Sequence, residues 1–231
     1  MVITRDQLGI CVCNIRTPLS SGKETTGTGT FIVKDSKIYI LTASHVVNNI
    51  NLKSYVVCSD SSGSPINILL TNLIGTNTFI HHPQADLAKV QLMYNPNNIL
   101  EKRCFPFEQI NITNDLISKD VELTSIGFPL GLGSGGAKFS PLTYRTYVAS
   151  PAISMTRADK KIISDFIILE LPSIGGYSGG PTFDLGYMIV GAMQTVKDKT
   201  ILHGVIHGTI SDETGGKLAA VTPCKYLDKW F

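Results

Sequence analysis

The sequence predicts an all-β protein. Short runs rich in β-branched and aromatic residues recur along the chain, turn-forming residues separate them, and helical periodicity is nearly absent. A chain of 231 residues is long enough for one large domain or for two small barrels that share an interface. We therefore expect a barrel or a sandwich of antiparallel strands rather than alternating strands and helices.

The first group of expected strands lies in the N-terminal half. Residues 28–33 and 38–42 predict a hairpin that turns at 34–37, and further strands are expected at 55–58, 66–73 and 87–93. Residues 94–119 carry two prolines and Asn-rich clusters with little alternation. We expect this stretch to connect two halves of the molecule.

A second group of expected strands follows the connection. These strands are predicted at 121–128, 144–150, 166–171, 181–183, 187–195 and 201–207. The apolar spacing of residues 223–231 predicts a short amphipathic closing helix with Pro223 in its first turn.

Composition argues against several classes of partner. The charged fraction is 16% and the net charge only +2, so we expect no nucleic-acid partner. No window approaches about 18 uninterrupted apolar residues and no leader segment is recognised, so we expect no membrane association. Five cysteines cannot all pair within one chain, and Cys11 and Cys13 lie on the same face of a strand. Free thiols and the missing leader together predict a cytoplasmic protein.

Two short patterns could suggest a metal or a cofactor. His81 and His82 are adjacent, so on a strand they point in opposite directions, and no cysteine or carboxylate cluster completes a zinc set. The glycine-rich stretch 131–136 is not followed by the Lys-Ser/Thr pair of a phosphate-binding loop. We expect neither a metal nor a cofactor.

The strongest functional signal is the turn Gly176-Tyr177-Ser178-Gly179-Gly180-Pro181. The glycines allow the backbone to expose the Ser178 hydroxyl as a nucleophile. They also allow the amides of Gly176 and Ser178 to point at one spot, where they would stabilise an oxyanion. This turn therefore predicts acyl-transfer chemistry.

Two upstream segments supply the partners that such a serine needs. His45, in Thr42-Ala43-Ser44-His45, is the expected general base, and Asp86 is the expected carboxylate that orients it. The order His45, Asp86, Ser178 puts the base and the carboxylate in the first half and the nucleophile in the second. We therefore expect a catalytic crevice between the two halves, with Ser178, His45 and Asp86 as a triad.

In these segments the sequence resembles the chymotrypsin-like serine proteases, chiefly their bacterial and high-temperature-requirement-type branches. The matching motifs stand in that family's order at 27–33, 41–47, 86–88, 126–129 and 177–181, and the resemblance extends over about residues 8 to 227. It implies two six-stranded antiparallel β-barrels with a short C-terminal helix. It also implies a serine endopeptidase that works through an acyl-enzyme.

The resemblance further implies a division into two barrels. Residues 1–110 would form an N-terminal barrel with His45 and Asp86, and residues 111–231 a C-terminal barrel with Ser178 and the substrate pocket. Tyr177 stands where the digestive branch has an aspartate, and no Ile-Val-Gly-Gly start is present. We therefore expect no activation by an N-terminal ion pair.

Specificity is predicted from position alone. Pro172 stands six residues before the serine, where a trypsin-like pocket has an acidic residue, so Arg and Lys at the cleaved position are disfavoured. The strand Gln194-Thr195-Val196 would line the pocket and pair with substrate, and Gly204 would leave depth below it. We expect small or medium uncharged side chains at the cleavage point.

Two alternatives remain open from the sequence. His203 or His207 could line the pocket instead, which would favour acidic or amide side chains. The chain could also be a protease-fold module that binds peptides while its oxyanion hole is collapsed. In each case the expected partner is a protein or peptide, and the sequence identifies no regulatory partner.

Overall fold

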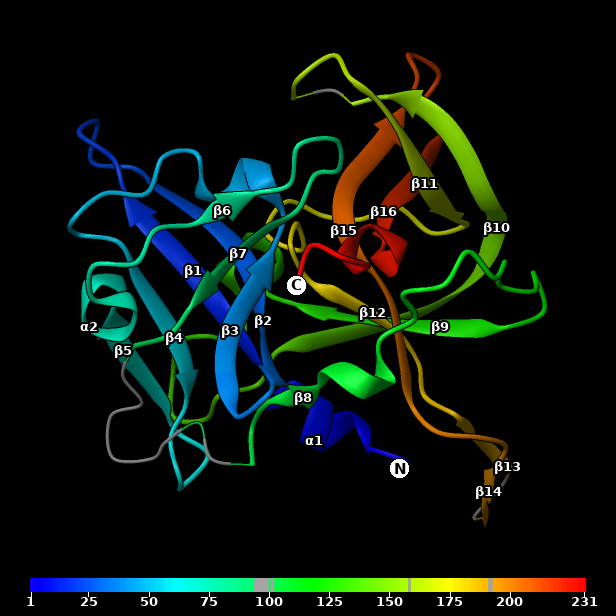
Figure 1. Ribbon diagram of the computed structural model, residues 1–231, viewed down its shortest axis with the longest axis horizontal. Coiled ribbons are helices and arrows are strands. Elements are labelled where there is room, and N and C mark those ends of the chain that lie inside the picture. The colour runs from blue at the N-terminus through cyan, green and yellow to red at the C-terminus, as the bar shows by residue number, and fades with distance from the viewer. Residues whose placement is uncertain (94–99, 101, 158, 191–192) are drawn as a thin grey trace.

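The computed structural model spans residues 1–231 and describes all of them except 94–99, 101, 158 and 191–192. Two bodies of antiparallel β-sheet lie side by side, built from the N-terminal and the C-terminal parts of the chain (Figure 1). The fold is therefore all-β, with a few short helices, and belongs to the chymotrypsin-like double-barrel class that the sequence predicts.

The first body is a sheet in which eight strands are described. Its order is β5-β4-β1-β2-β3-β7-β6, with β8 added in parallel beside β2. The strands are β1 (Val12–Pro18), β2 (Glu24–Lys34), β3 (Lys37–Thr42), β4 (Tyr55–Ser59), β5 (Pro65–Leu69), β6 (Ile80–His81), β7 (Ala88–Gln91) and β8 (Phe105–Pro106). The short helices are α1 (Arg5–Gly9), η1 (Ser44–Val47), α2 (Leu70–Ile74) and η3 (Phe107–Gln109).

The predicted hairpin at the start of this body is confirmed. Strands β2 and β3 pair from Gly29 with Thr42 to Lys34 with Lys37. Asp35 and Ser36 turn the chain between them with positive φ angles of 49° and 61°. Such tight turns favour residues like Asp that tolerate the left-handed region.

The second body is a closed barrel. Its strand order is β10-β11-β16-β15-β12-β9. The strands are β9 (Glu122–Gly127), β10 (Leu142–Thr156), β11 (Ile163–Leu169), β12 (Pro181–Asp184), β15 (Ile201–Ser211) and β16 (Lys217–Pro223). The turns η4 (Pro129–Gly131) and η5 (Cys224–Leu227) complete it, so the expected closing helix is a single 3₁₀ turn.

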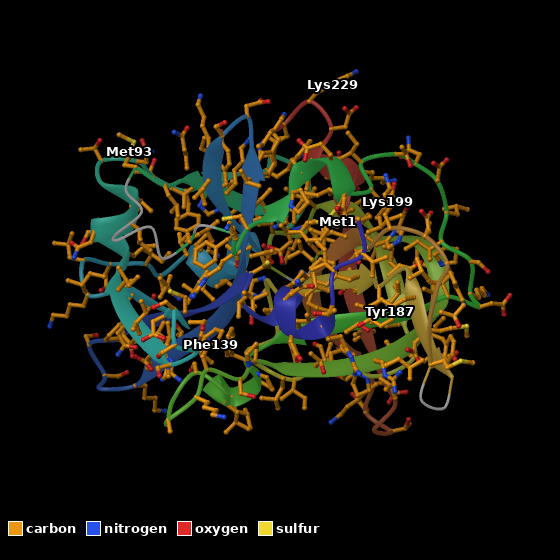
Figure 2. The ribbon with its side chains drawn as sticks, turned by 90° about the horizontal axis from the view of Figure 1, so that it is seen from below. Met1, Met93, Phe139, Tyr187, Lys199 and Lys229 are labelled. Carbon is orange, nitrogen blue, oxygen red and sulfur yellow. The ribbon has the colours of Figure 1, made fainter. Side chains whose placement is uncertain are left out.

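One predicted barrel strand has a different place. Residues 187–195 were expected to form a single strand, but they belong to β13 (Tyr187–Val190) and β14 (Met193–Val196). Within the described part of the chain these two strands pair only with each other, in a hairpin that projects from the barrel (Figures 1 and 2). At its base, the amides of Lys197 and Asp198 both donate to the carbonyl of Gly186. The chain thus leaves the barrel after β12 and re-enters it at β15.

The two bodies share one apolar core. A cluster of buried side chains combines Ile32, Leu41 and Phe105 of the first body with residues of the second. The ring centroids of Phe105 and Phe183 lie 5.0 Å apart across this junction. Burial of aromatic surface here holds the two bodies together and so fixes their relative position.

The cysteines are free thiols, as the sequence predicts. All except Cys104 are buried, and burial raises the pKa of the Cys11 thiol to about 12. Such thiols are packing groups rather than nucleophiles. Among the described residues, the helices are too short and too polar to cross a membrane.

We expect Phe183→Ala to lower the free energy of unfolding by about 3–5 kcal/mol, because it opens a cavity at the junction of the two bodies. Urea denaturation measures this loss. The matched control is Ile163→Ala, since Ile163 is 66% exposed and its truncation should cost less than about 0.5 kcal/mol. Equal losses in the two variants would show that Phe183 does not support the junction.

Candidate active site

The serine turn rests directly on the first body. The Ser178 carbonyl accepts a hydrogen bond of 2.8 Å from the amide of Thr28 on β2. The next residue, Gly179, has a φ of +85°, and a side chain there would overlap the carbonyl oxygen of Thr28 and the hydroxyl of Thr42. Only glycine therefore allows the turn to approach β2 and β3 this closely.

Gly176 has a similar constraint. Its φ is +105°, and a Cβ would overlap the main chain of Phe128. The hydroxyl of Thr28 donates to the Gly176 carbonyl at 2.7 Å, which fixes the peptide. Among the described residues, neither the Gly176 N–H nor the Ser178 N–H has an acceptor within the protein. Both amides are therefore available to a ligand.

His45 is positioned by η1, which begins directly after β3. The preceding side chain, Ser44, is buried and shares a hydrogen bond of 2.7 Å with Nδ1 of His81. The His45 side chain itself is 30% exposed. One edge of its imidazole can therefore meet a substrate while the other faces the protein.

Asp86 lies in the loop between β6 and β7 and is fully buried. That loop is shaped by His82, whose Nδ1 accepts the amides of Gln84 and Ala85 at 3.1 and 2.8 Å. The Asp86 carboxylate accepts two hydrogen bonds from His45, one from its amide at 3.1 Å and one from Nδ1 at 2.6 Å. The sequence-predicted pair is therefore brought together.

Two groups that the sequence did not assign to this carboxylate also reach it. His207 on β15 places Nδ1 at 2.5 Å from Oδ2 of Asp86, and Arg157 places Nη2 at 3.4 Å from Oδ1. Burial alone raises the pKa of the Asp86 carboxyl, but the hydrogen bonds from His207 and His45 outweigh it and hold the pKa well below its usual range. Asp86 is therefore a carboxylate at neutral pH.

Arg157 is a fully buried cation in the turn between β10 and β11. Its guanidinium pairs with Asp159 at 2.6 Å and donates to the carbonyl of Gln84 at 2.8 Å. Asp159 lies two residues from Arg157 in the sequence, which weakly indicates an ion pair between them. The contact with Asp86, 71 positions away, has no local signal at all.

The serine hydroxyl completes the cluster from the second body. Ser178 Oγ donates to the main-chain carbonyl of His207 at 3.2 Å. The rings of His207 and His45 stand nearly perpendicular, with centroids 5.7 Å apart. The structure therefore gathers Ser178, His45 and Asp86 at the junction of the two bodies.

His45, Asp86 and His207 also have the donor types of a metal site. Their N···O separations are 2.5 and 2.6 Å. A tetrahedral zinc ion with bonds of about 2.0–2.1 Å would hold such atoms roughly 3.3 Å apart. The observed spacing fits hydrogen bonds rather than a shared metal.

Comparison with known proteins agrees with this geometry. A family model described as the trypsin-like peptidase domain matches residues 27–191, which is more than half of the chain. The chain belongs to this family. By its description, this is a family of peptidases.

One curated protein is similar in sequence to most of this chain. It is 32% identical over 167 residues to a probable periplasmic serine endoprotease, DegP-like, of Bartonella henselae. The match covers 71% of this chain but only 27% of that relative, so the chain spans about a quarter of the relative's length.

Solved structures share the fold of this peptidase. The active form of the Rv3671c protease from M. tuberculosis superposes with a TM-score of 0.62 at 18% identity, covering 97% of this chain and 80% of that one. The apo MamO protease domain from Magnetospirillum magneticum gives 0.61 at 12% identity, covering 99% of each chain. At these identities the likeness concerns the fold alone.

The predicted cytoplasmic location is wrong. The curated relative of this peptidase is named as a periplasmic endoprotease, which contradicts the prediction. The inference failed because it used free thiols as a sign of compartment. Buried thiols with raised pKa values react slowly in any compartment, so they carry no such information.

The structure separates most of the predicted pocket residues of this peptidase from the serine. Gln194, Thr195 and Val196 lie on β14 of the projecting hairpin rather than beside Ser178. Gly204 lies in the barrel wall, where a side chain would overlap Val221 of β16. Its missing side chain makes room for packing rather than for substrate.

The strand that passes the serine is instead β15. The amide of Gly179 donates to the Ile206 carbonyl at 2.8 Å, and the amide of Ile206 donates to the Gly180 carbonyl at 2.8 Å. His203 and His207, the alternative pocket residues, have different partners. His203 bonds through Nδ1 to Asn111, whereas the ring of His207 faces Asp86. His203 lines a surface cavity together with Asn111 and Thr113.

A different pair of residues connects β15 to the loop before the serine. Thr209 of β15 donates to the Ser173 carbonyl at 2.6 Å, and the two hydroxyls lie 3.0 Å apart. Ser173 follows the exposed Pro172 in the loop that leads to Ser178. These two hydrogen bonds join the loop before Ser178 to β15.

We expect Arg157→Met to lower the free energy of unfolding by about 3–5 kcal/mol, because it removes the buried cation that pairs with Asp159 and leaves the buried carboxylate of Asp86 without part of its compensating charge. Chemical denaturation measures the loss. Arg145→Met is the matched control: Arg145 pairs with Glu122 at the surface, with 53% of its side chain exposed, so its replacement should cost less than about 1 kcal/mol. An Arg157 variant as stable as the control would contradict the structural role of the buried pair.

Proposed function

We propose that the chain is a serine endopeptidase in which Ser178 is the nucleophile, His45 the general base and acid, and Asp86 the residue that orients His45. The observation that carries the proposal is the double hydrogen bond from the amide and Nδ1 of His45 to one buried carboxylate. That arrangement fixes both the position and the proton state of the ring.

The proton state follows from the partner. Asp86 keeps a depressed pKa and can only accept, so Nδ1 of His45 must carry the hydrogen of their bond. The other ring nitrogen, Nε2, is then left with its lone pair and can accept the Ser178 proton. For attack, the hydroxyl must turn from the His207 carbonyl, where it rests, to the imidazole of His45.

The acyl transfer then proceeds in two steps. Ser178 Oγ bonds to the substrate carbonyl carbon as its proton passes to His45, and the free amides of Gly176 and Ser178 bind the carbonyl oxygen as it becomes negative. His45 returns the proton to the leaving amine, and the peptide bond breaks. A water molecule, activated by His45 in the same way, hydrolyses the acyl-enzyme.

The alternative of a peptide-binding module with a collapsed oxyanion hole is less well supported. A collapsed hole has at least one of the two amides turned away from the serine, and a bond to the protein would hold it there. Among the described residues, neither amide has such an acceptor. No hydrogen bond described here therefore holds this peptide in a collapsed state.

We also propose that Thr209 and Ser173 limit the residue at the cleavage point to small or medium uncharged side chains. Their hydroxyl bridge spans the gap between β15 and the loop before the serine, so a long side chain would have to displace it. No carboxylate takes part in this bridge to attract Arg or Lys.

We expect Ser178→Ala to abolish labelling by a fluorophosphonate probe and to lower the rate of peptide hydrolysis by roughly 10⁶, because the three residues act as a unit. Ser150→Ala, on β10 away from the site, is the control and should label like wild type. A folded wild-type protein that fails to label would refute the enzyme and favour the binding module.

We expect Thr209→Gly to extend cleavage to larger apolar residues such as Phe, because it removes one half of the bridge. A peptide-library cleavage profile measures the change. Thr195→Gly is the discriminating comparison and should leave the profile unaltered, since Thr195 lies on the projecting hairpin. A cleavage profile that changes in Thr195→Gly but not in Thr209→Gly would instead support the pocket predicted from sequence.

A further inference from the structure

His207 occupies an irregular position in its strand. Ile206 pairs with Val221 and Gly208 pairs with Ala220, so His207 is the extra residue of a β-bulge between β15 and β16. A bulge redirects the side chain of its extra residue and removes that residue from the regular ladder. Both consequences are visible here, because the ring reaches Asp86 and the carbonyl accepts the Ser178 hydroxyl.

The ring of His207 is fixed rather than free. It packs against Phe166 of β11 with centroids 5.0 Å apart, and only 10% of its side chain is exposed. The titratable or charged groups that face it are Asp86 and His45, with Arg157 on the far oxygen of the same carboxylate. Its contacts are therefore with the catalytic groups rather than with a substrate pocket.

We propose that His207 is a positioning residue for catalysis. Its Nδ1–H holds the Asp86 carboxylate in the orientation that His45 needs, while its carbonyl holds the resting Ser178 hydroxyl. The proposal rests on the roles proposed above for Ser178, His45 and Asp86. It adds His207 to those three residues. His207 belongs to the second body, and its hydrogen bond to Asp86 crosses the junction between the bodies.

The physical reason is that one buried carboxylate oxygen depends on two hydrogen bonds. Oδ2 of Asp86 accepts from both imidazoles, at 2.6 Å from His45 and 2.5 Å from His207. A buried carboxylate that loses one such charged hydrogen bond is left partly unsatisfied and can rotate or admit water. His45 would then lose its fixed tautomer and direction, which slows proton transfer without changing how substrate binds.

The test compares two replacements of His207. Leu has a similar volume and cannot donate, so His207→Leu should lower kcat about 10- to 100-fold with KM nearly unchanged. Asn presents an amide N–H near the position of Nδ1, so His207→Asn should recover most of kcat. His203→Leu is the matched control, because His203 lies on the same strand and bonds to Asn111 instead.

Proton NMR of ¹⁵N-histidine-labelled protein gives a readout that does not depend on activity. Wild type should show two downfield imidazole Nδ1–H signals, one from His45 and one from His207. His207→Leu should lose one signal and shift the other, while His203→Leu should retain both. The NMR measurement can also be made on a protein that shows no activity. A wild-type protein that does not react with the fluorophosphonate probe would refute the proposed function, but it would leave this test of His207 intact.

Several results would overturn the proposal. One is an unchanged kcat in a folded His207→Leu variant, and another is an equal loss in His203→Leu. A rise in KM with kcat preserved would move His207 to the substrate pocket. His207→Leu could fail to fold. In that case, a single downfield signal in the wild-type protein would contradict the proposed role of His207. A folded His207→Asn variant whose kcat stays far below that of wild type would contradict it as well.

Discussion

The arrangement of the molecule depends on one buried carboxylate. Asp86 is fully buried yet ionised, so the fold must surround it with donors. His45 supplies two hydrogen bonds from the first body, whereas His207 and Arg157 approach from the second. Because neither body alone satisfies the charge, the stability of the site and the docking of the two bodies are the same requirement.

A second constraint acts beside the first. The serine turn reaches β2 and β3 only because Gly179 has no side chain, and Thr28 then binds the turn through both its amide and its hydroxyl. Ser178 is thus placed by backbone contact and His45 by a carboxylate. These two attachments converge where the apolar core of the two bodies meets, so a weakened core would disturb both at once.

The sequence could predict those parts of the structure that local pattern encodes. The β2–β3 hairpin and the pairing of His45 with Asp86 follow from alternation, turn residues and motif order. The projecting hairpin at 187–196 was missed because a hairpin and one long strand have similar apolar content. The contacts of Arg157 and His207 were missed because they join residues 71 and 121 positions apart through a turn and a bulge.

The missed hairpin explains why Gln194–Val196 were predicted to lie on the strand beside the serine. Counting along the chain assigns Gln194–Val196 to the strand beside the serine, but β13 and β14 leave the barrel and return before that strand begins. The strand beside Ser178 is therefore β15, which carries the bulged His207 and then Thr209. The residue proposed to orient the carboxylate and the residue proposed to limit the cleaved side chain thus lie two positions apart on one strand. If both proposals hold, a change in the bulge affects rate and specificity together, whereas a change in the hairpin affects neither.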